Sequence, residues 1–338
     1  MSIARQLPKL GVTLYSFTPS YHAGTHSLVD LVRRVAEEKL GPYIEVVGFQ
    51  SFRGFPYLSD NEIASFRDIL ARYELKLSCV GANADIALHS DRLLNEDETV
   101  EYMAAQLETA SRLGAPVARI QNGVKPAVIE RLLPLAEKLD VRMGMELHAP
   151  STLQSEWVQE IRALYERLDS PYAGWIPDFG ASTRRISPSI FKALAPKGAT
   201  PDLHAAFQAH WDDLGGTAED MGLIIGGFLE IARRHGLGDI ALPVSIYAAG
   251  LHGRMNPADW AELVLRTVHI HGKFFEIDET GNEPAIDYET VLRVFVENGY
   301  SGTISSEFES WHWQPDVDGF AMVQRQQALS RRVLGPLC

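Results

Sequence analysis

Eight short apolar segments alternate with longer segments whose apolar residues recur at helical spacing, and this alternation runs through most of the chain. Strands that alternate with helices predict a parallel sheet, because each helix returns the chain to the edge where the next strand starts. Eight such repeats are the number that closes a (β/α)8 barrel. The predicted strands are residues 10–17, 43–49, 75–80, 117–121, 142–148, 173–179, 269–275 and 303–308. The sequence therefore predicts an α/β fold of the TIM-barrel type.

The connecting segments support the same fold. Ser59 and Glu62 stand at the spacing of a capping box, in which the two side chains satisfy the first backbone N–H groups of a helix. An open doubly wound sheet is the alternative, but it usually has a glycine-rich turn after its first strand, and residues 15–22 contain no glycine. We expect residues 1–338 to form a single barrel domain. The predicted helices are residues 27–40, 59–73, 95–113, 126–139, 155–168, 257–267 and 287–298.

Residues 182–258 interrupt the alternation between the sixth and seventh predicted strands. The interruption starts with a segment rich in proline and glycine and continues with a predicted helix near residues 217–235. It ends in a segment rich in alanine and glycine that we expect to be a loop. Because loops that follow barrel strands open at the catalytic face, this insertion is either a surface elaboration or an active-site lid or subunit interface.

The composition narrows the range of partners. The 338 residues contain 31 Lys and Arg against 44 Asp and Glu, and the formal net charge of −13 repels nucleic acid and anionic lipid. No apolar run has the length of a membrane span, and the N-terminus shows no signal-peptide pattern. The two cysteines, Cys79 and Cys338, predict no disulfide framework. We therefore expect a cytoplasmic protein that binds neither nucleic acid nor membrane.

Polar side chains stand in or near the ends of the last four predicted strands, where a buried strand would be apolar. Because the carboxyl ends of barrel strands meet at one mouth, these side chains are expected to surround one point. Carboxylates that lie together repel one another, so a divalent cation would stabilise the group. Oxygen and imidazole ligands suit Mn²⁺, Co²⁺, Fe²⁺ or Zn²⁺, with Mg²⁺ less favoured. The predicted ligands are Glu146, Asp178, His271 and Glu307, with His269 and His204 as alternatives.

Two further residues share a strand face with predicted ligands. His148 lies two residues beyond Glu146 and Lys273 two residues beyond His271, so each points to the same side as that ligand. An imidazole beside a metal-bound carboxylate is placed to act as a general base, and a lysine there could neutralise an oxyanion or bind a hydroxyl group. The simpler interpretations are a hydrogen-bond partner of the ligands for His148 and a surface lysine for Lys273.

Three residues near other strand ends are candidates for substrate binding. Asn83 follows the third predicted strand and Gln121 ends the fourth, where their amides could bind hydroxyl groups, although a loop amide is more often a turn former. Trp311 follows the last strand in a Trp-His-Trp segment whose rings could stack on a sugar or an aromatic ligand. The same rings could instead pack under the barrel loops or against another subunit.

Several of these motifs together resemble one superfamily. They are typical of the xylose-isomerase-like TIM barrels, which include sugar and sugar phosphate isomerases and epimerases. The resemblance implies that Glu146, Asp178, His271 and Glu307 hold one divalent metal, most often Mn²⁺, and that Glu146 and Glu307 can act as a paired acid and base, as in ketose 3-epimerases. The motifs are residues 146–148 (ELH), 178–180 (DFG), 269–273 (HIHGK), 298–302 (NGYSG) and 302–307 (GTISSE).

Three departures from that pattern point to a narrower branch. The long insertion, His148 beside the first glutamate, and the segment 311–313 are more similar to the large subunit of bacterial C-glycoside deglycosidases. That resemblance implies cleavage of the carbon–carbon bond between a 3-oxo sugar and an aromatic aglycone, with a small second subunit. In such a reaction, a base removes the sugar C2 proton, which the ketone acidifies, and the C1 substituent leaves by elimination.

The residues leave other activities open. A sugar isomerase or 3-epimerase shares the deprotonation step and differs only in the later steps of its reaction. A nuclease resembling endonuclease IV shares the barrel but normally needs more metal ligands, and the negative net charge disfavours it. A scaffold or partner subunit with a degenerate site is disfavoured because the four predicted ligands are all present.

Overall fold

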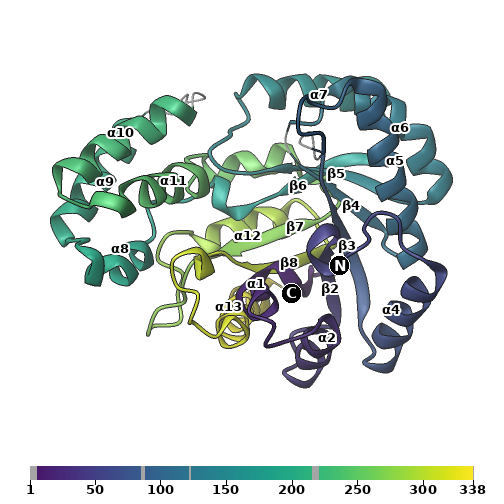
Figure 1. Ribbon diagram of the computed structural model, residues 1–338, viewed down its shortest axis with the longest axis horizontal. Coiled ribbons are helices and arrows are strands. Elements are labelled where there is room, and N and C mark those ends of the chain that lie inside the picture. The colour runs from purple at the N-terminus through teal and green to yellow at the C-terminus, as the bar shows by residue number, and fades with distance from the viewer. Residues whose placement is uncertain (1–5, 85–87, 122, 215–220, 338) are drawn as a thin grey trace.

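Eight parallel strands form the centre of the computed structural model, which describes residues 6–84, 88–121, 123–214 and 221–337 (Figure 1). Within the sheet the strands follow the order β6-β5-β4-β3-β2-β1-β8-β7. The two outer strands meet through bridges between Trp175 and Thr267 and between Asp178 and His271, which close the barrel. The strands are β1 (Lys9–Thr13), β2 (Tyr43–Val47), β3 (Lys76–Ala82), β4 (Val117–Ile120), β5 (Arg142–Leu147), β6 (Ala173–Pro177), β7 (Ile270–Phe274) and β8 (Thr303–Phe308).

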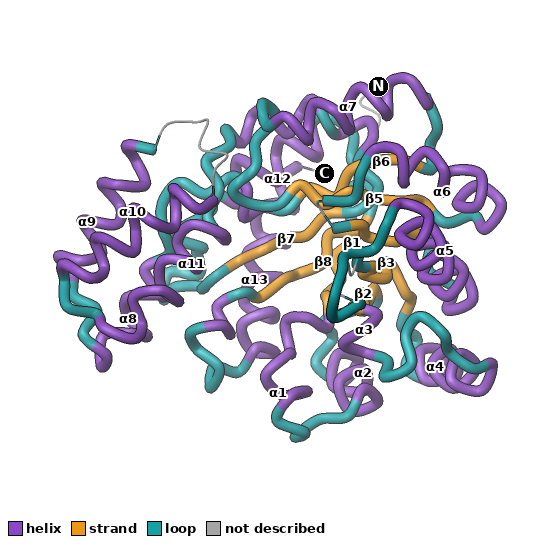
Figure 2. Tube along the Cα trace, turned by 45° about the horizontal axis from the view of Figure 1, so that its top comes forward, coloured by secondary structure: helices purple, strands orange, loops and turns teal. Residues whose placement is uncertain are grey.

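Helices surround the strands, as Figure 2 shows. The predicted capping box is confirmed, because Ser59 Oγ accepts from Glu62 N while Ser59 N donates to Glu62 Oε2 at 2.8 Å. Short helices α1 (Thr18–His22) and α3 (Gly48–Ser51) follow β1 and β2. The surrounding helices are α2 (Leu28–Glu37), α4 (Asp60–Arg72), α5 (Glu96–Leu113), α6 (Pro126–Leu139), α7 (Glu156–Leu168), α12 (Tyr288–Glu297) and α13 (Gly319–Leu334). The predicted (β/α)8 barrel is therefore confirmed.

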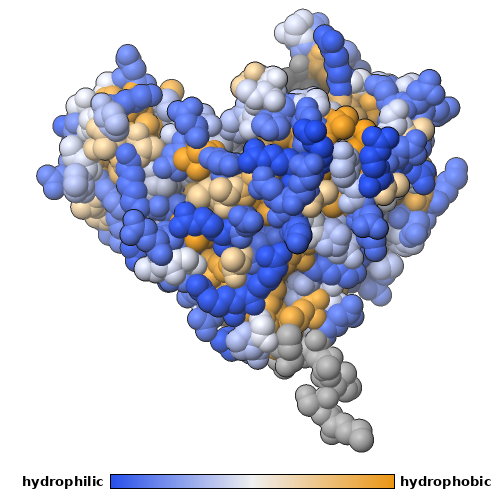
Figure 3. All heavy atoms as spheres, turned by 90° about the horizontal axis from the view of Figure 1, so that it is seen from below, coloured by the Kyte–Doolittle hydropathy of each residue, from blue (hydrophilic) through white to orange (hydrophobic). Residues whose placement is uncertain are grey.

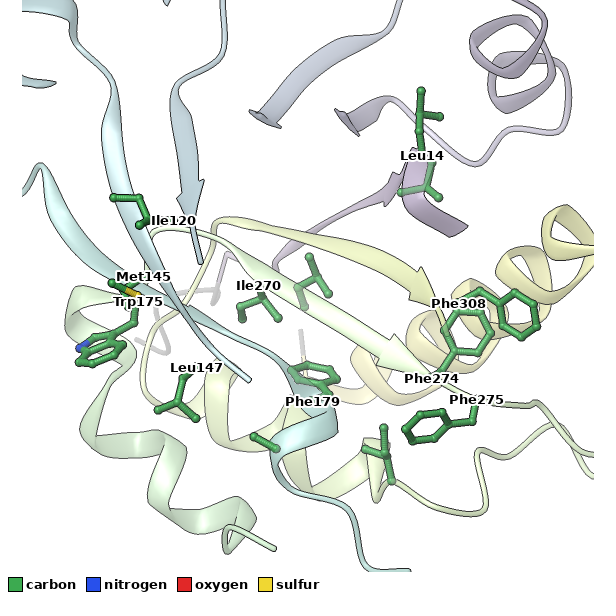
Figure 4. Packing of buried hydrophobic residues seen from close by; sticks show 14 of the residues in the cluster. Leu14, Ile120, Met145, Leu147, Trp175, Phe179, Ile270, Phe274, Phe275 and Phe308 are labelled. Carbon is green, nitrogen blue, oxygen red and sulfur yellow. The ribbon is translucent and has the colours of Figure 1, made fainter. Parts of the chain in front are cut away.

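Successive side chains on strands β7 and β8 point alternately outward to the apolar core under the helices and inward to the charged interior of the barrel. Phe274 of β7 and Phe308 of β8 lie next to each other in Figure 4, with ring centroids 5.4 Å apart. They belong to the apolar core under the helices. Their sequence neighbours Lys273 and Glu307 face the barrel interior, because successive strand residues point to opposite sides. The barrel mouth is thus the place where charged groups gather.

Three local predictions were wrong. Residues Leu14–Phe17 form a 3₁₀ turn and not the end of the first strand, because Thr13 Oγ1 accepts from Tyr15 N and turns the chain. The predicted helix 257–267 is two 3₁₀ turns, Pro257–Glu262 and Val264–Arg266, whose path is fixed by the buried Trp260. The alanine- and glycine-rich segment expected to be a loop contains helix α11 (Ala241–Leu251), whose small buried residues pack against α10.

The segment between β6 and β7 forms a separate group of helices on one side of the barrel (Figures 1 and 2). The two ends of this segment lie side by side where it joins the barrel. Ser182 and Arg254 form an antiparallel bridge there, and Gly253 N donates to Gly180 O at 2.7 Å. The predicted helix near 217–235 corresponds to α10, and residues 215–220 lie outside the described part of the chain. The helices are α8 (Pro188–Leu194), α9 (Pro201–Asp213), α10 (Met221–Arg234) and α11.

Hydrophilic residues cover most of the face drawn in Figure 3, with small scattered hydrophobic areas. Among the described residues, no helix has both the length and the apolar character that a membrane crossing requires.

Candidate metal centre and cavity

The four predicted ligands lie together at the barrel mouth. One side-chain atom from each lies within 4.8 Å of the corresponding atoms of the others, and all four residues are buried. The fold explains this convergence, because Glu146, His271 and Glu307 stand near the ends of β5, β7 and β8. Asp178 directly follows β6, where its Oδ1 accepts from Gly180 N at 2.7 Å.

Opposite charges hold the group together. His271 Nδ1 lies 2.6 Å from Glu146 Oε1 and 3.7 Å from Glu307 Oε2. Burial disfavours a charged imidazole, but the carboxylates around His271 outweigh it and raise the pKa of His271 well above its usual value. Burial and the neighbouring carboxylates of Asp178 and Glu309 raise the pKa of Glu307 to about 8. Burial also disfavours the charged form of Glu146, but Arg119 and His271 lower the pKa of Glu146 below its usual value.

The donor set fits a divalent cation. Glu307 Oε2 and Asp178 Oδ2 are buried, and neither accepts a hydrogen bond from any residue that the structure describes. Lys273 Nζ lies 2.8 Å from Asp178 Oδ2 and 3.8 Å from Glu307 Oε2, so it supplies part of the positive charge that these oxygens require. Three carboxylates and an imidazole are ligands that Mn²⁺, Co²⁺, Fe²⁺ and Zn²⁺ accept.

Glu45 of β2 also contacts the four-residue group, and the sequence analysis did not identify it. Its Oε1 lies 3.0 Å from His271 Nε2, and its Oε2 lies 2.9 Å from His269 Nε2. His269 also contacts Ser305 Oγ at 2.9 Å, so this alternative ligand lies one pleat deeper than the four-residue group. Glu45, Cys79 and His269 have ligand atoms within 4.8 Å of one another, but the Glu45 and His269 atoms are already paired. A charged residue inside the apolar strand 43–49 was the available signal.

A cavity of about 260 Å³ opens beside the four-residue group. Four glutamates line its wall, together with one arginine, one lysine and two histidines. The wall includes the substrate or catalytic candidates Gln121, Glu146, His148, Lys273 and Glu307. It includes neither Asn83 nor Trp311. The described residues of the insertion do not line it. The wall consists of Thr13, Tyr15, Glu45, Val47, Phe49, Arg119, Gln121, Glu146, His148, His271, Lys273, Glu307 and Glu309.

His148 and Lys273 contact each other inside this cavity. Lys273 Nζ lies 2.6 Å from His148 Nε2 and 3.3 Å from Glu309 Oε2. Since Lys273 is only 1% exposed, its interpretation as a surface lysine is wrong. His148 Nδ1 lies 2.7 Å from the Ala149 carbonyl oxygen, which can only accept, so Nδ1 carries a proton. That tautomer leaves the Nε2 lone pair as the acceptor for Lys273 Nζ.

The remaining candidates lie at the edge of the site. The Asn83 backbone is fixed by Gln106, whose amide accepts from Asn83 N and donates to Asn83 O, each at 2.8 Å. Trp311 stacks on His312 and meets the Tyr15 ring edge-on, with centroids 5.3 Å apart. It therefore reaches the cavity wall through Tyr15.

His204, the other alternative ligand, lies on α9 and stacks on Phe191, outside the four-residue group.

Known proteins share this chain over nearly its whole length. The 3'-dehydrocarminate deglycosidase alpha subunit of Microbacterium sp is 45% identical over 339 residues, which cover 99% of this chain and 97% of that protein. A C-glycoside deglycosidase alpha subunit of Arthrobacter globiformis is 41% identical over 330 residues, covering 96% and 90% of the two chains. The chain belongs to the C-glycoside deglycosidase alpha subunit family. The resemblance drawn from the motifs and the departures is thereby confirmed.

Solved structures of other proteins share the barrel fold of this chain. A D-tagatose 3-epimerase-like protein superimposes with a TM-score of 0.51 at 19% identity, over 97% of this chain and 98% of that one. The IolI protein, solved with a bound zinc atom, gives a TM-score of 0.55 at 12% identity, over 98% and 99% of the two chains. At these identities the likeness establishes the fold alone. No protein-family model matches the sequence.

Proposed function

We propose that this chain is the metal-binding, catalytic subunit of an enzyme that cleaves 3-oxo C-glycosides. The observation that carries the proposal is the buried group of three carboxylates and His271, with His148 Nε2 at the edge of the same cavity. A relative that is 45% identical is named for the deglycosylation of 3'-dehydrocarminate. The substrate class is a sugar oxidised at C3 and joined through carbon to an aromatic aglycone.

We assign the metal ligands to Glu146, Asp178, His271 and Glu307, and Mn²⁺ as the first choice of metal, with Co²⁺, Fe²⁺, Zn²⁺ and Mg²⁺ as alternatives. A divalent cation bound there would draw electrons from a substrate carbonyl and so acidify the neighbouring C–H bond.

His148 is the proposed base. Its unprotonated Nε2 takes the proton from sugar C2, and the electron pair of that bond moves toward the carbonyl. The C1–aglycone bond then breaks, C1 and C2 become doubly bonded, and a proton is delivered to the departing carbon. Lys273 Nζ lies 2.6 Å from the same Nε2, so this contact opens before Nε2 takes the proton. Gln121 lines the same cavity, where its amide is placed to bind a sugar hydroxyl group.

The family name implies a second subunit, because the relatives are alpha subunits. We propose a small partner subunit and a hetero-oligomer. Helices α8–α11 form a lid or an interface in that assembly, since Tyr247 of α11 donates to His312 O at 3.3 Å, next to the wall residues of the cavity.

A sugar isomerase or 3-epimerase activity is the second candidate, because Glu146 and Glu307 both line the cavity and could exchange a proton between two faces of a sugar. The deciding experiment supplies Mn²⁺ and either 3'-dehydrocarminate or a ketohexose to the chain purified with its small subunit. Released aglycone supports the lyase, whereas a converted ketohexose with no aglycone release supports the epimerase.

A further inference from the structure

Arg119 is a buried arginine that faces the cavity and has few partners. It stands in β4, is 7% exposed, and lines the cavity wall. Among the described residues, its one ion pair is with Glu146, whose Oε2 lies 3.5 Å from Nη1. In the parts of the chain that the structure describes, no group accepts a hydrogen bond from its guanidinium, and Nε is fully buried without a partner. A guanidinium offers five N–H donors, and leaving them unpaired away from water is unfavourable.

The neighbouring strand β3 leaves room for the Arg119 side chain. Gly81 of β3 is paired with Arg119 across the sheet. A Cβ atom at Gly81 would lie 3.1 Å from Arg119 Nη2 and 3.4 Å from Val47 Cα, which is tighter than ordinary packing allows. The guanidinium therefore occupies space that a side chain at position 81 would take.

Lys273, the other buried cation of the cavity, is differently placed. Its Nζ lies 2.8 Å from Asp178 Oδ2, 3.3 Å from Glu309 Oε2 and 2.6 Å from His148 Nε2. Two carboxylates and an imidazole therefore surround the ammonium group at short range. A substrate oxygen would have to displace one of them to reach Lys273, whereas Arg119 has donors to spare.

We infer that Arg119, and not Lys273, binds the sugar oxygen on which negative charge develops when the proton leaves C2. This inference rests on the proposed function and names the residue that recognises the 3-oxo sugar. A planar guanidinium can donate to two oxygens at once, so a carbonyl and its neighbouring hydroxyl group form a suitable ligand. The cavity of about 260 Å³ is smaller than a typical site for a drug-sized ligand. It suits the sugar ring, with the aglycone extending outward.

The competing role for Arg119 is to hold Glu146 in place. The test therefore compares Arg119→Ala and Arg119→Lys with the wild-type chain, each purified with its small subunit. Mn²⁺ binding is measured by calorimetry without substrate, and kcat and KM are measured with 3'-dehydrocarminate. Arg142→Ala is the matched control, because Arg142 also stands on a barrel strand but lines a different pocket, together with Lys9 and Tyr43.

We expect both Arg119 variants to keep Mn²⁺ affinity within about threefold of the wild type. Arg119→Ala should lose about 10²–10³-fold in kcat/KM, as when one oxyanion donor is removed, and guanidinium chloride should restore part of that loss. The kcat/KM of Arg119→Lys should lie between those of the wild type and Arg119→Ala, because lysine keeps the positive charge but not the planar guanidinium that donates to two oxygens at once. This variant remains informative if Arg119→Ala does not fold.

Two results overturn the inference. A loss of Mn²⁺ affinity that parallels the loss of kcat/KM would make Arg119 a positioning residue for Glu146. An unchanged kcat/KM in Arg119→Lys and Arg119→Ala would leave it without a role in binding. Failure of the proposed function is separate, because the wild-type complex would then release no aglycone. In that case the same variants are compared by calorimetric binding of a ketohexose, and equal affinities would again reject the inference.

Discussion

Glu45 Oε1 lies 3.0 Å from His271 Nε2, on the opposite side of the ring from Glu146, whose Oε1 lies 2.6 Å from Nδ1. The imidazole is thus held between two carboxylates from β2 and β5. Since Glu45 is 1% exposed and its other oxygen pairs with His269, it cannot turn away without breaking two contacts. Glu45 therefore fixes the His271 ring so that Nδ1 faces the proposed metal position.

Replacing Glu45 should weaken metal binding without removing a ligand. We expect Glu45→Gln to lose about 10–100-fold in Mn²⁺ affinity, the usual effect of removing a carboxylate that orients a histidine ligand. Calorimetric titration of the purified variant measures this. Ser305→Ala is the control, since the Ser305 hydroxyl contacts the His269 ring and, in the residues described, forms no hydrogen bond with the His271 ring. Its affinity should stay near that of the wild type. Equal losses in the two variants would contradict an orienting role for Glu45.

The metal site itself can be tested with two glutamates that lie close together. Glu307 belongs to the four-residue group, and Glu309 lines the same cavity but does not belong to that group. We expect one divalent metal per chain in the wild type and in Glu309→Ala, and none in Glu307→Ala, by elemental analysis. A chelator should lower the melting temperature of the wild type, because a bound cation stabilises the folded state. Full occupancy in Glu307→Ala would reject the proposed ligand set.

The convergence of the four proposed ligands could be predicted from the sequence, because strand ends obey a simple geometric rule. Glu146, Asp178 and Glu307 end or follow apolar segments, and every barrel brings such ends to one mouth. Glu45 and Arg119 stand inside their strands, where a sequence shows that a charge is buried but not which groups it contacts. Their partners depend on the relative positions of strands that are far apart in the sequence, such as β2 and β7, and the sequence does not give these positions.

A buried serine connects the insertion to the barrel. Ser189 Oγ of α8 accepts from Trp313 Nε1 at 3.0 Å and lies 3.2 Å from Ser310 Oγ. Ser189→Ala should lower the free energy of unfolding by about 1–3 kcal/mol, because the Trp313 indole would be left buried without an acceptor. Urea denaturation measures the change. Ser65→Ala on the exposed face of α4 is the matched control, and its effect should stay within about 0.5 kcal/mol. Equal effects would show that Ser189 does not anchor the insertion.

His252 should make the fold sensitive to acid. Burial and the charge of Lys273 lower the pKa of His252 to about 3, against the opposing charge of Glu309, and its Nε2 accepts from Ser187 N at 3.0 Å. Between pH 6.5 and 3 the unfolded chain binds a proton at this residue and the folded chain does not, so stability falls as the pH falls. His252→Gln should show a shallower loss of melting temperature over that window than the wild type. Parallel curves would contradict the assignment.

Replacing His148, the proposed base, is the test that best distinguishes the lyase from the epimerase activity. His148 Nδ1 donates to the Ala149 carbonyl, so Nε2 is the unprotonated atom, and it lies 3.7 Å from Asp178 Oδ2 without belonging to the four-residue group. His148→Ala should therefore keep its metal while kcat falls by about 10²–10⁴-fold, the usual contribution of a positioned acid or base. His22→Ala, at an exposed histidine, should change neither quantity. If His148→Ala loses metal and activity together, His148 is itself a ligand, and the place of His271 among the ligands must be tested again. If its activity hardly changes, the protons move through Glu146 and Glu307, and the epimerase mechanism becomes the better account.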